Sequence, residues 1–267
     1  MSKVFKFGGA SVKNPKAIYN LKEIVSSYKE NLVIVISAID KTTNKLELVW
    51  KNYLENKTLK STEIAKEIIK FHKAIIEDLE LNNNSDFLKL FNDLTLELVD
   101  YIGAKTKQEN NISYSKIVSF GELFSTLIIS SYLNKEDVEN TWIDAREFIK
   151  TSNNATDSRV NWKETKRKIN SNLSKNKTYL TQGFIGSNLN GVTTTLGREG
   201  SDFSAAIFAW SMDVEEVIIW KDVDGLLNAD PKWFDKTQIL KKISFKEAIE
   251  LSYLGASVIH PNTVKPL

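Results

Sequence analysis

Residues 32–37 read Leu-Val-Ile-Val-Ile-Ser, an apolar run of strand length with no polar side chain before its last position. A strand with one face in water alternates apolar and polar residues, whereas a strand covered on both faces is apolar throughout. The run therefore predicts a buried strand with helices on both faces of its sheet. Short strand-like runs alternate with helical patterns on either side of it, which is typical of a largely parallel sheet. The predicted fold class is α/β.

The remaining pattern predicts one domain with two lobes. Asn14-Pro15 supplies an N-cap and a first-turn proline for a helix over residues 15 to about 28, and Asn190-Gly191 is a strong hairpin turn. Further strands are expected at residues 4–7, 141–145, 178–185, 193–196 and 216–220. Further helices are expected at residues 45–54, 61–81, 85–102, 119–133, 201–212 and 244–254, and residues 112–118 form a separate segment before the fourth of these.

Composition excludes several classes of function. The chain has 267 residues, 42% of them hydrophobic, and its 36 Lys and Arg nearly balance its 34 Asp and Glu. A net charge of +2 gives no sign of a nucleic-acid or membrane partner. There is no cysteine and there are two histidines, which excludes disulfides and thiolate sites and disfavours a multi-histidine zinc site. The most apolar stretch, residues 32–39, is far shorter than a membrane helix, and the first residues lack a signal-peptide pattern, so we expect a cytoplasmic protein.

The first candidate site is Lys6-Phe7-Gly8-Gly9-Ala10-Ser11, where a cation at a strand end precedes two glycines. Glycines let backbone N–H groups approach phosphate oxygens, which a side chain would hold away. No Walker A pattern occurs in the chain. A tight strand-to-helix turn with a solvated lysine is the alternative interpretation.

A second candidate, residues 197–202, lies between a predicted strand and a predicted helix. Ser201 or Asp202 could cap that helix, whose N-terminus favours an anion. Ser119-x-x-Glu122 and Ser244-x-x-Glu247 both fit the capping box, which alone gives Glu122 a structural role.

A third candidate follows the predicted strand at residues 216–220. Asp222 and Asp224 lie where open α/β sheets bind ligands, yet Asp-x-Asp-Gly is also common in turns. His260 before Pro261 is interpreted as a packed side chain rather than a base.

These segments occur together in one order, which is more specific than any of them alone. They are KFGGAS (6–11), SAIDKTTN (37–44), SFGELFST (119–126), DAR (144–146), TQGFIGSN (181–188), TTTLGREGSD (193–202), WKDVDGLLNADP (220–231) and GASVIHP (255–261). With these segments the chain resembles, from Lys3 onward, the aspartate kinase branch of the amino acid kinase family. The resemblance implies a three-layer αβα sandwich around a mostly parallel sheet.

The resemblance also implies transfer of the γ-phosphoryl group of ATP, with Mg²⁺, to the β-carboxylate of L-aspartate. The product would be 4-phospho-L-aspartate, a first step toward lysine, threonine and methionine. By motif match, the catalytic group is Lys6, Gly8, Gly9 and Asp202. The substrate group is Ser37, Thr43, Glu122, Phe184, Arg198 and Ser201, and the nucleotide group is Lys221, Asp222, Leu227, Lys232 and Ser257. No protein ligand to the metal is expected, because ATP would carry it.

The chemistry of aspartate suits two of these residues. Arg198 can bind a carboxylate through two parallel hydrogen bonds, and Glu122 can supply the anion for the ammonium group. With this resemblance, the functional interpretation of Glu122 outweighs the capping one. No general base is needed, because the attacking carboxylate is already ionised at neutral pH.

The sequence departs from many of the chains it resembles. They carry Thr at Ala10, Gly or Ser at Glu199, Pro at Asp224, Tyr at Leu227, Arg at Lys232 and Lys at Ser257. They also continue past residue 261 into a last piece of the kinase fold and ACT-type regulatory domains. We therefore expect an amino-acid lobe at about residues 1–186, a nucleotide lobe at about 187–267 that is truncated, no ACT domain, and no inhibition by lysine or threonine.

Two alternatives stay open at this point. One is another amino acid kinase that acts on glutamate, carbamate or a nucleotide. The other is a non-catalytic nucleotide-binding module that has kept the fold. A homodimer is possible, and neither nucleic acid nor a membrane is expected as a partner.

Overall fold

The computed structural model describes residues 3–104, 108–223, 225–253 and 259–267. Its main sheet has five strands in the order β3-β5-β2-β1-β8, and every neighbouring pair is parallel. The predicted mostly parallel α/β sheet is therefore confirmed. The strands are β1 (Lys3–Phe7), β2 (Leu32–Ile36), β3 (Thr141–Ile143), β5 (Tyr179–Gln182) and β8 (Glu216–Trp220).

Helices cover both faces of this sheet. Phe5 and Phe7 lie on one face, where Phe5 contacts Tyr28 just after α1 (Pro15–Ser26), and α5 (Asn110–Lys135) packs along β5 and β3. Lys6 points to the opposite face, which α8 (Gly200–Met212) covers, with α7 (Trp162–Asn172) packed against α8. All five residues of β2 are buried, as the apolar run predicts.

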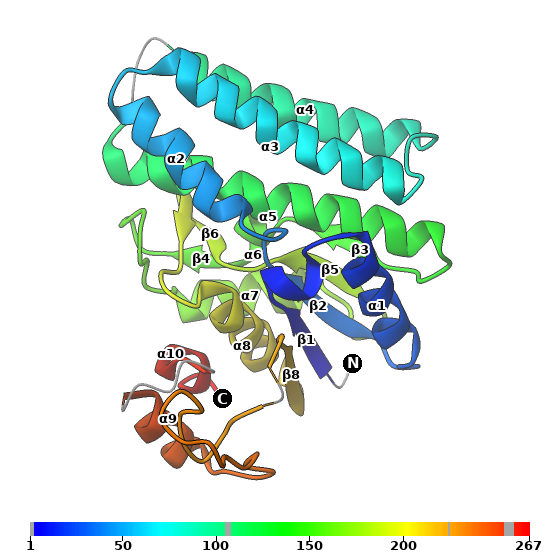
Figure 1. Cartoon of the computed structure of the whole chain (residues 1–267), viewed down its shortest axis with the longest axis vertical. Helices are drawn as coiled ribbons and strands as arrows, with labels where there is room; N and C mark the ends of the chain where they lie inside the picture. Colours follow the sequence, from blue (N-terminus) through cyan, green and yellow to red (C-terminus); the bar gives the residue numbers. More distant parts are fainter. Residues whose placement is uncertain (1–2, 105–107, 224, 254–258) are drawn as a thin grey trace.

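Three further helices lie beyond α5, away from the sheet (Figure 1). They are α2 (Thr42–Leu54), α3 (Thr58–Asp78) and α4 (Ser85–Gly103). α2 and α4 both pack on α5, and α3 packs on α2 and α4. α5 is therefore enclosed between the sheet and a helical layer. By length and composition α5 could cross a membrane, but 83% of its most apolar window is buried within the protein, as expected of a core helix.

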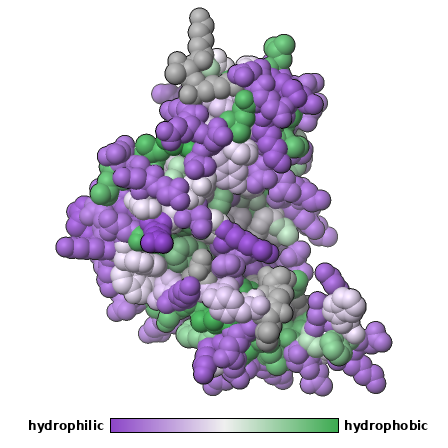
Figure 2. All heavy atoms as spheres, turned by 90° about the vertical axis from the view of Figure 1, so that its left-hand side faces the viewer, coloured by the Kyte–Doolittle hydropathy of each residue, from purple (hydrophilic) through white to green (hydrophobic). Residues whose placement is uncertain are grey.

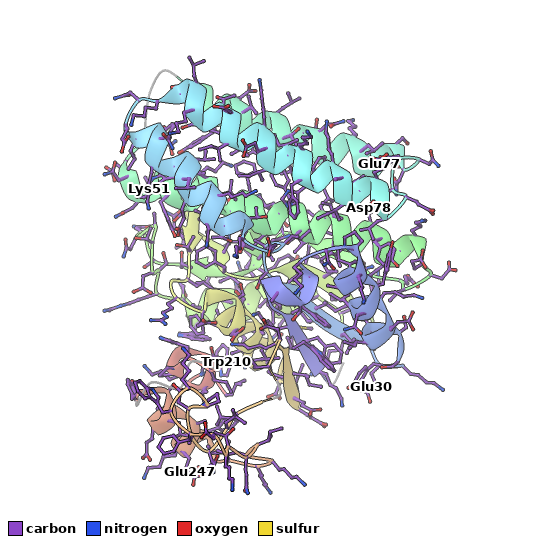
Figure 3. All side chains as sticks on the ribbon, viewed as in Figure 1. Glu30, Lys51, Glu77, Asp78, Trp210 and Glu247 are labelled. Carbon is purple, nitrogen blue, oxygen red and sulfur yellow. The ribbon has the colours of Figure 1, made fainter. Side chains whose placement is uncertain are left out.

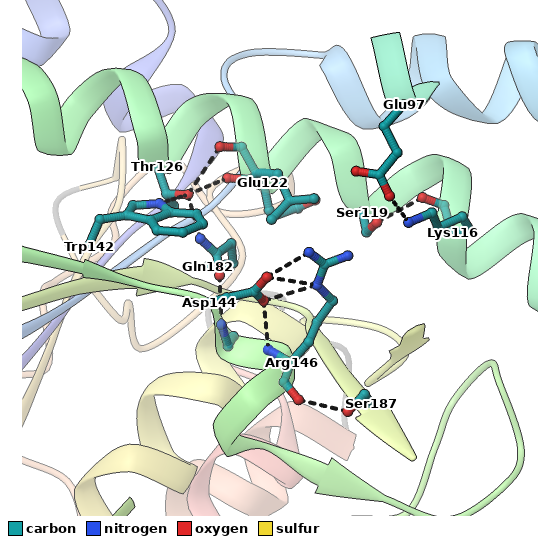
Figure 4. Close-up of polar contacts among 12 residues, drawn as sticks. Glu97, Lys116, Ser119, Glu122, Thr126, Trp142, Asp144, Arg146, Gln182 and Ser187 are labelled. Atoms are coloured by element: carbon teal, nitrogen blue, oxygen red, sulfur yellow. Dashed lines mark hydrogen bonds and ion pairs between the residues drawn. The ribbon is translucent and has the colours of Figure 1, made fainter. Parts of the chain in front are cut away.

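The predicted helix start at Ser119 is wrong. α5 is continuous from Asn110, and the Ser119 hydroxyl donates to the Lys116 carbonyl (2.7 Å) instead of capping a helix (Figure 4). A serine inside a helix can make this bond to the preceding turn, so the Ser-x-x-Glu spacing does not distinguish a start from an interior. The second capping box is confirmed, because Ser244 exchanges hydrogen bonds with Glu247 at the start of α9 (Phe245–Tyr253); Figure 3 labels Glu247.

The strand predicted over residues 178–185 is two strands. Phe184 has a left-handed backbone (φ 68°) that turns the chain out of β5 and into β6 (Ile185–Asn188) of a second, three-stranded sheet. There β6 pairs with β7 (Thr193–Thr195) through the predicted Asn190-Gly191 hairpin. Four short elements have no counterpart in the sequence prediction: η1 (Gly9–Val12), α6 (Ala145–Phe148), β4 (Lys150–Thr151) and α10 (Pro261–Val264). The sequence prediction also lacks α7.

The segment after β8 packs loosely. Among residues 225–253 only Ala248 is buried, whereas Trp233 is 82% exposed and Phe234 is 59% exposed. Figure 2 shows apolar surface between polar side chains at this lower end of the molecule, where Figure 1 places α9 and α10. This part of the chain contributes little to the main core.

Candidate active site

Two lysines and an aspartate meet at the carboxyl ends of neighbouring strands. Lys6 lies near the end of β1, and Lys221 directly follows β8. Lys6 Nζ is 2.6 Å from Asp202 Oδ1, and Lys221 Nζ is 2.9 Å from Asp202 Oδ2. The Asp202 side chain is fully buried, and Lys6 is nearly so. Both ammonium groups thus face the edge of the sheet where open α/β folds bind ligands.

Asp202 belongs to the first turn of α8, where the helix dipole favours a negative charge. The prediction that Ser201 or Asp202 caps this helix is wrong. The N-cap is Glu199, whose backbone is left-handed (φ 53°) and whose side chain makes no capping bond. The chain turns sharply here, which places Asp202 inside the helix and leaves its carboxylate for the two lysines.

The loop after β1 is closely packed. A Cβ atom on Gly9 would lie 2.8 Å from the Ala38 carbonyl oxygen, so no side chain fits there. The Gly9 carbonyl accepts a hydrogen bond from the Asp40 N–H (3.2 Å), which joins this loop to the one after β2. Gly8 is more open, since a Cβ there would lie 3.4 Å from Lys6 Nζ. Gly9 is therefore needed for packing, while Gly8 leaves the space beside Lys6 clear.

Glu122 is an acid buried inside α5, with 3% of its surface exposed. Burial raises its pKa to about 8, although backbone groups of Glu122 itself and Ala38 and the charge of Lys6 act in the opposite direction. Among the described residues, Glu122 Oε2 has no hydrogen-bond partner. A buried carboxyl group with an unused oxygen near a cationic site is available to a ligand.

A hydrogen-bond network fixes the helical turn that carries Glu122 (Figure 4). Thr126 Oγ1 donates to the Glu122 carbonyl (2.7 Å) and accepts from Gln182 Nε2 (2.7 Å) and Trp142 Nε1 (3.0 Å). Gln182 Oε1 in turn accepts from the Ala145 N–H (2.7 Å). α5 is thereby fastened to β5, β3 and α6, and Glu122 is held in a fixed place.

The other predicted substrate residues border this region from different elements. The backbone of Ser37 bonds Phe7 on one side and the Ser125 hydroxyl on the other, and Thr43 lies in the first turn of α2. A Cβ on Gly183 would lie 2.5 Å from Ser201 Cβ, and one on Gly200 would lie 2.8 Å from the Phe184 ring. Phe184 and Ser201 thus lie beside one another. Arg198 is exposed in the loop before α8, and no ion pair to it occurs within the described ranges.

The predicted nucleotide residues do not form one cluster. Asp222 and Lys232 are exposed, and Leu227 pairs with Ile239 across a short bridge farther along the chain. Ser257 lies outside the described residues, as does Asp224. Lys221 was assigned to the nucleotide loop, yet its ammonium contacts Asp202 opposite Lys6. Sequence reasoning missed this contact because nothing in the sequence indicates that β8 pairs with β1.

Across the described ranges, no group of three or more His, Asp and Glu side chains could hold a metal ion. A separate pocket of about 440 Å³ contains none of the predicted site residues. It is lined by Trp162, Phe203, Trp210 (labelled in Figure 3), Lys265 and Pro266.

Comparison with known proteins gives a consistent result. The chain is 32% identical over 277 residues to a bifunctional aspartokinase/homoserine dehydrogenase of Buchnera aphidicola, covering 99% of this chain and 34% of that protein. It is 31% identical to the lysine-sensitive aspartokinase 3 of Escherichia coli, covering 98% of this chain and 58% of that protein. The crystal structure of E. coli aspartokinase III with aspartate and ADP superposes with a TM-score of 0.85 at 30% identity, covering 100% of this chain and 59% of that one.

The chain thus spans about one third to three fifths of the length of these relatives. A model of the amino acid kinase family matches residues 1–267. The paired lysines at the strand ends, the αβα layers and this match agree, and the chain belongs to the amino acid kinase family.

Proposed function

We propose that this chain is the catalytic unit of an aspartate kinase, which transfers the γ-phosphoryl group of ATP to the β-carboxylate of L-aspartate. The observation that carries the proposal is the buried Glu122 within electrostatic reach of Lys6. A site that presents a buried anion beside paired cations suits an acceptor with an ammonium group and carboxylates. The relatives named aspartokinase support the same choice.

Each of these residues binds a group of the opposite charge. Lys6 faces the phosphate that is transferred, and Glu122 binds the ammonium of aspartate in its ionised form. Arg198, exposed and without an ion pair within the described ranges, can close on a carboxylate of the substrate. Phosphoryl transfer needs alignment of the reactants and neutralisation of charge rather than covalent help from the protein. Bound Mg²⁺ would neutralise part of the phosphate charge.

The test is ATP-dependent formation of aspartyl hydroxamate in the presence of hydroxylamine, with glutamate and carbamate as matched acceptors. Product from aspartate and little from the other acceptors is expected. Preference for glutamate or carbamate would assign the chain to another amino acid kinase. Nucleotide binding without any product would identify a non-catalytic module.

We propose a cytoplasmic location, although some curated relatives are chloroplast proteins. We also propose a homodimer, and a division into an amino-acid lobe at about residues 1–186 and a nucleotide lobe at about 187–267. Sedimentation of the purified chain would test the homodimer.

A further inference from the structure

Residues 152–159, which follow β4, form a loop that is held against β7 and α5. The Ala155 carbonyl accepts a hydrogen bond from the Thr195 N–H (2.9 Å) and another from the Ser115 hydroxyl (2.6 Å). The Thr195 carbonyl accepts in turn from the Ser158 N–H (2.9 Å). Backbone bonds therefore fix this loop at Ala155 and Ser158, and the residues between them are held in one place.

Asp157 lies between these two bonded residues and directs its carboxyl group at Gly197. A Cβ atom on Gly197 would lie 2.3 Å from Asp157 Oδ1, so the carboxyl group fills the space that a side chain at position 197 would need. The Asp157 backbone is left-handed (φ 48°), a conformation that aspartate accepts more readily than most side chains do. Among the described residues, the Asp157 carboxylate has no hydrogen-bond partner and no ion pair. The loop thus brings a negative charge to Gly197 without using it for a bond.

Arg198 directly follows Gly197 in a tight turn. The Gly197 carbonyl accepts from the Gly200 N–H (3.1 Å), and both Gly197 (φ 75°) and Glu199 (φ 53°) have left-handed backbones. The turn determines the direction in which the Arg198 side chain leaves the chain. That side chain is exposed, and within residues 3–104, 108–223, 225–253 and 259–267 it forms no ion pair. Its guanidinium group is therefore free to close on a ligand.

The guanidinium group of Arg198 can reach the carboxylate of Asp157. Neighbouring Cα atoms are about 3.8 Å apart, so Asp157 Oδ1 lies within about 8 Å of the Arg198 Cα, a distance that an extended arginine side chain spans. A guanidinium group is planar and has five N–H donors, so it can bind one carboxylate on each of two edges. Asp157 and the carboxylate of an acceptor can therefore bind Arg198 together.

We propose that Asp157 is a positioning residue for Arg198, whose guanidinium binds Asp157 with one edge while the other edge closes on the acceptor carboxylate. The proposal rests on the kinase function proposed above and adds to it a residue that affects acceptor binding. Ordering a long side chain on binding costs conformational entropy. A carboxylate in a fixed loop lowers that cost, because it restricts the orientations of Arg198 to those that face the acceptor. Asp157 itself does not contact the acceptor.

The test uses Asp157→Asn, which keeps the size of the side chain and accepts a left-handed backbone but removes the charge. Asp213→Asn is the matched control, because Asp213 is also an exposed aspartate with a left-handed backbone (φ 55°) and lies at the other end of α8. In Asp157→Asn the aspartate KM should rise about three- to fivefold, as after loss of one exposed ion pair, while kcat and the ATP KM keep their wild-type values. Asp213→Asn should change none of the three constants.

A double-mutant cycle with Arg198→Met separates positioning of Arg198 from a change in loop shape. Once the guanidinium is absent, Asp157→Asn should leave the aspartate KM unchanged or lower it, because Asp157 then only repels the carboxylates of the substrate. The same rise of the aspartate KM in both backgrounds would show that Asp157 acts through the shape of the loop and would overturn the proposal. A wild-type or lower aspartate KM in Asp157→Asn alone would also overturn it. If Asp157→Asn does not fold, Asp157→Gly, which suits the left-handed backbone, takes its place with the same expected rise.

The acceptor assay keeps failure of this proposal apart from failure of the kinase assignment. If the wild-type chain forms aspartyl hydroxamate and Asp157→Asn has the wild-type aspartate KM, the kinase assignment stands and the role of Asp157 is rejected. If the wild-type chain phosphorylates glutamate or carbamate instead, aspartate is the wrong acceptor, and the same cycle is measured with the acceptor that reacts. If no acceptor reacts, Arg198 has no carboxylate substrate to bind, and both proposals are rejected.

Discussion

A carboxyl group as buried as that of Glu122 makes the stability of the fold depend on pH. Burial raises its folded pKa from the ordinary 4.5 to about 8. Between those values the folded state keeps a proton that the unfolded state has lost, so stability is full below pH 4.5 and falls as the pH rises through 8. At neutral pH, the proposed function therefore needs the ionised form of Glu122, which the fold disfavours. The ammonium group of a bound substrate would stabilise that ionised form.

We predict that Glu122→Gln raises the free energy of unfolding at pH 8.5, relative to wild type, by about a few kcal/mol and by almost nothing at pH 4.5. The same variant should weaken aspartate binding at least tenfold, because a neutral amide replaces a charged partner. Urea unfolding across this pH range and aspartate titration measure the two effects. Glu63→Gln, on an exposed position of α3, is the control and should change neither. If the free energy of unfolding changes with pH by the same amount in wild type and in Glu122→Gln, the raised pKa of Glu122 is contradicted.

His72 has the opposite pH dependence. It is fully buried between Phe71 and Phe124, its Nδ1 bonds the Ile68 carbonyl, and burial lowers its pKa to about 4. The unfolded chain takes up a proton near the ordinary pKa of 6.5, so the stability contributed by neutral His72 is present above pH 6.5 and is lost as the pH falls toward 4.

We predict that His72→Phe, which fits the aromatic surroundings, removes this part of the acid sensitivity. The stability of wild type relative to the variant should fall by roughly 3 kcal/mol between pH 7 and pH 4. Thermal unfolding at a series of pH values measures the difference. A constant difference over that range would show that His72 takes up a proton in the folded state as readily as in the unfolded state.

Among the elements, β5 and α8 meet closely at Gly183, which directly follows β5, and Ser201 in the first turn of α8. A Cβ atom on Gly183 would lie 2.5 Å from Ser201 Cβ. The predicted strand over residues 178–185 gave no sign of this contact, because strand patterns report which face is buried and not which element lies against it. Helix capping was predictable where the pattern lies at a true helix start, as at Asn14, whose side chain accepts from the Ala17 N–H, and at Ser244 with Glu247.

We predict that Gly183→Ala destabilises the protein by about 1–3 kcal/mol, because the methyl group overpacks the β5–α8 contact. Gly103→Ala is the matched control, since a Cβ there meets nothing within 4 Å and alanine favours the helix end of α4. Chemical denaturation of both variants gives the comparison. If Gly183→Ala and Gly103→Ala are equally stable, α8 can move away from β5 without a loss of stability.

Over the whole molecule, the sequence predicted best those structural features that depend on a single physical signal. The apolar run of β2 predicted a buried strand, and alternation of strands and helices predicted the parallel sheet. Strand order could not be predicted, because periodicity contains no information on which strands are neighbours. For that reason Lys6, Glu122 and Asp202 were found by motif, whereas the contact of Lys221 with Asp202 required the structure.

We predict that amide hydrogens exchange slowest in α5 and fastest in residues 225–253 of the described chain. Residues 117–130 of α5 are all buried, while in that later segment only Ala248 is buried. Local opening follows the amount of buried apolar contact, so the two regions should differ by several kcal/mol in opening free energy, up to the ~5–15 kcal/mol typical of global unfolding. Hydrogen exchange followed by mass spectrometry measures this. Comparable protection in both regions would show that the segment after β8 is held by the core.

The pairing of β1 with β8 also determines when the site can form during synthesis. Lys3 is made 213 residues before its partner Glu216, counting from 3 to 216. At ordinary ribosomal rates of about 5–20 residues per second, β1 waits roughly 10–40 seconds for that partner. During this time the nascent chain exposes one unpaired edge of β1 and the apolar side chains beside it, a state that invites misassociation. The emerging chain is therefore a natural client for chaperones that shield strand edges until β8 arrives.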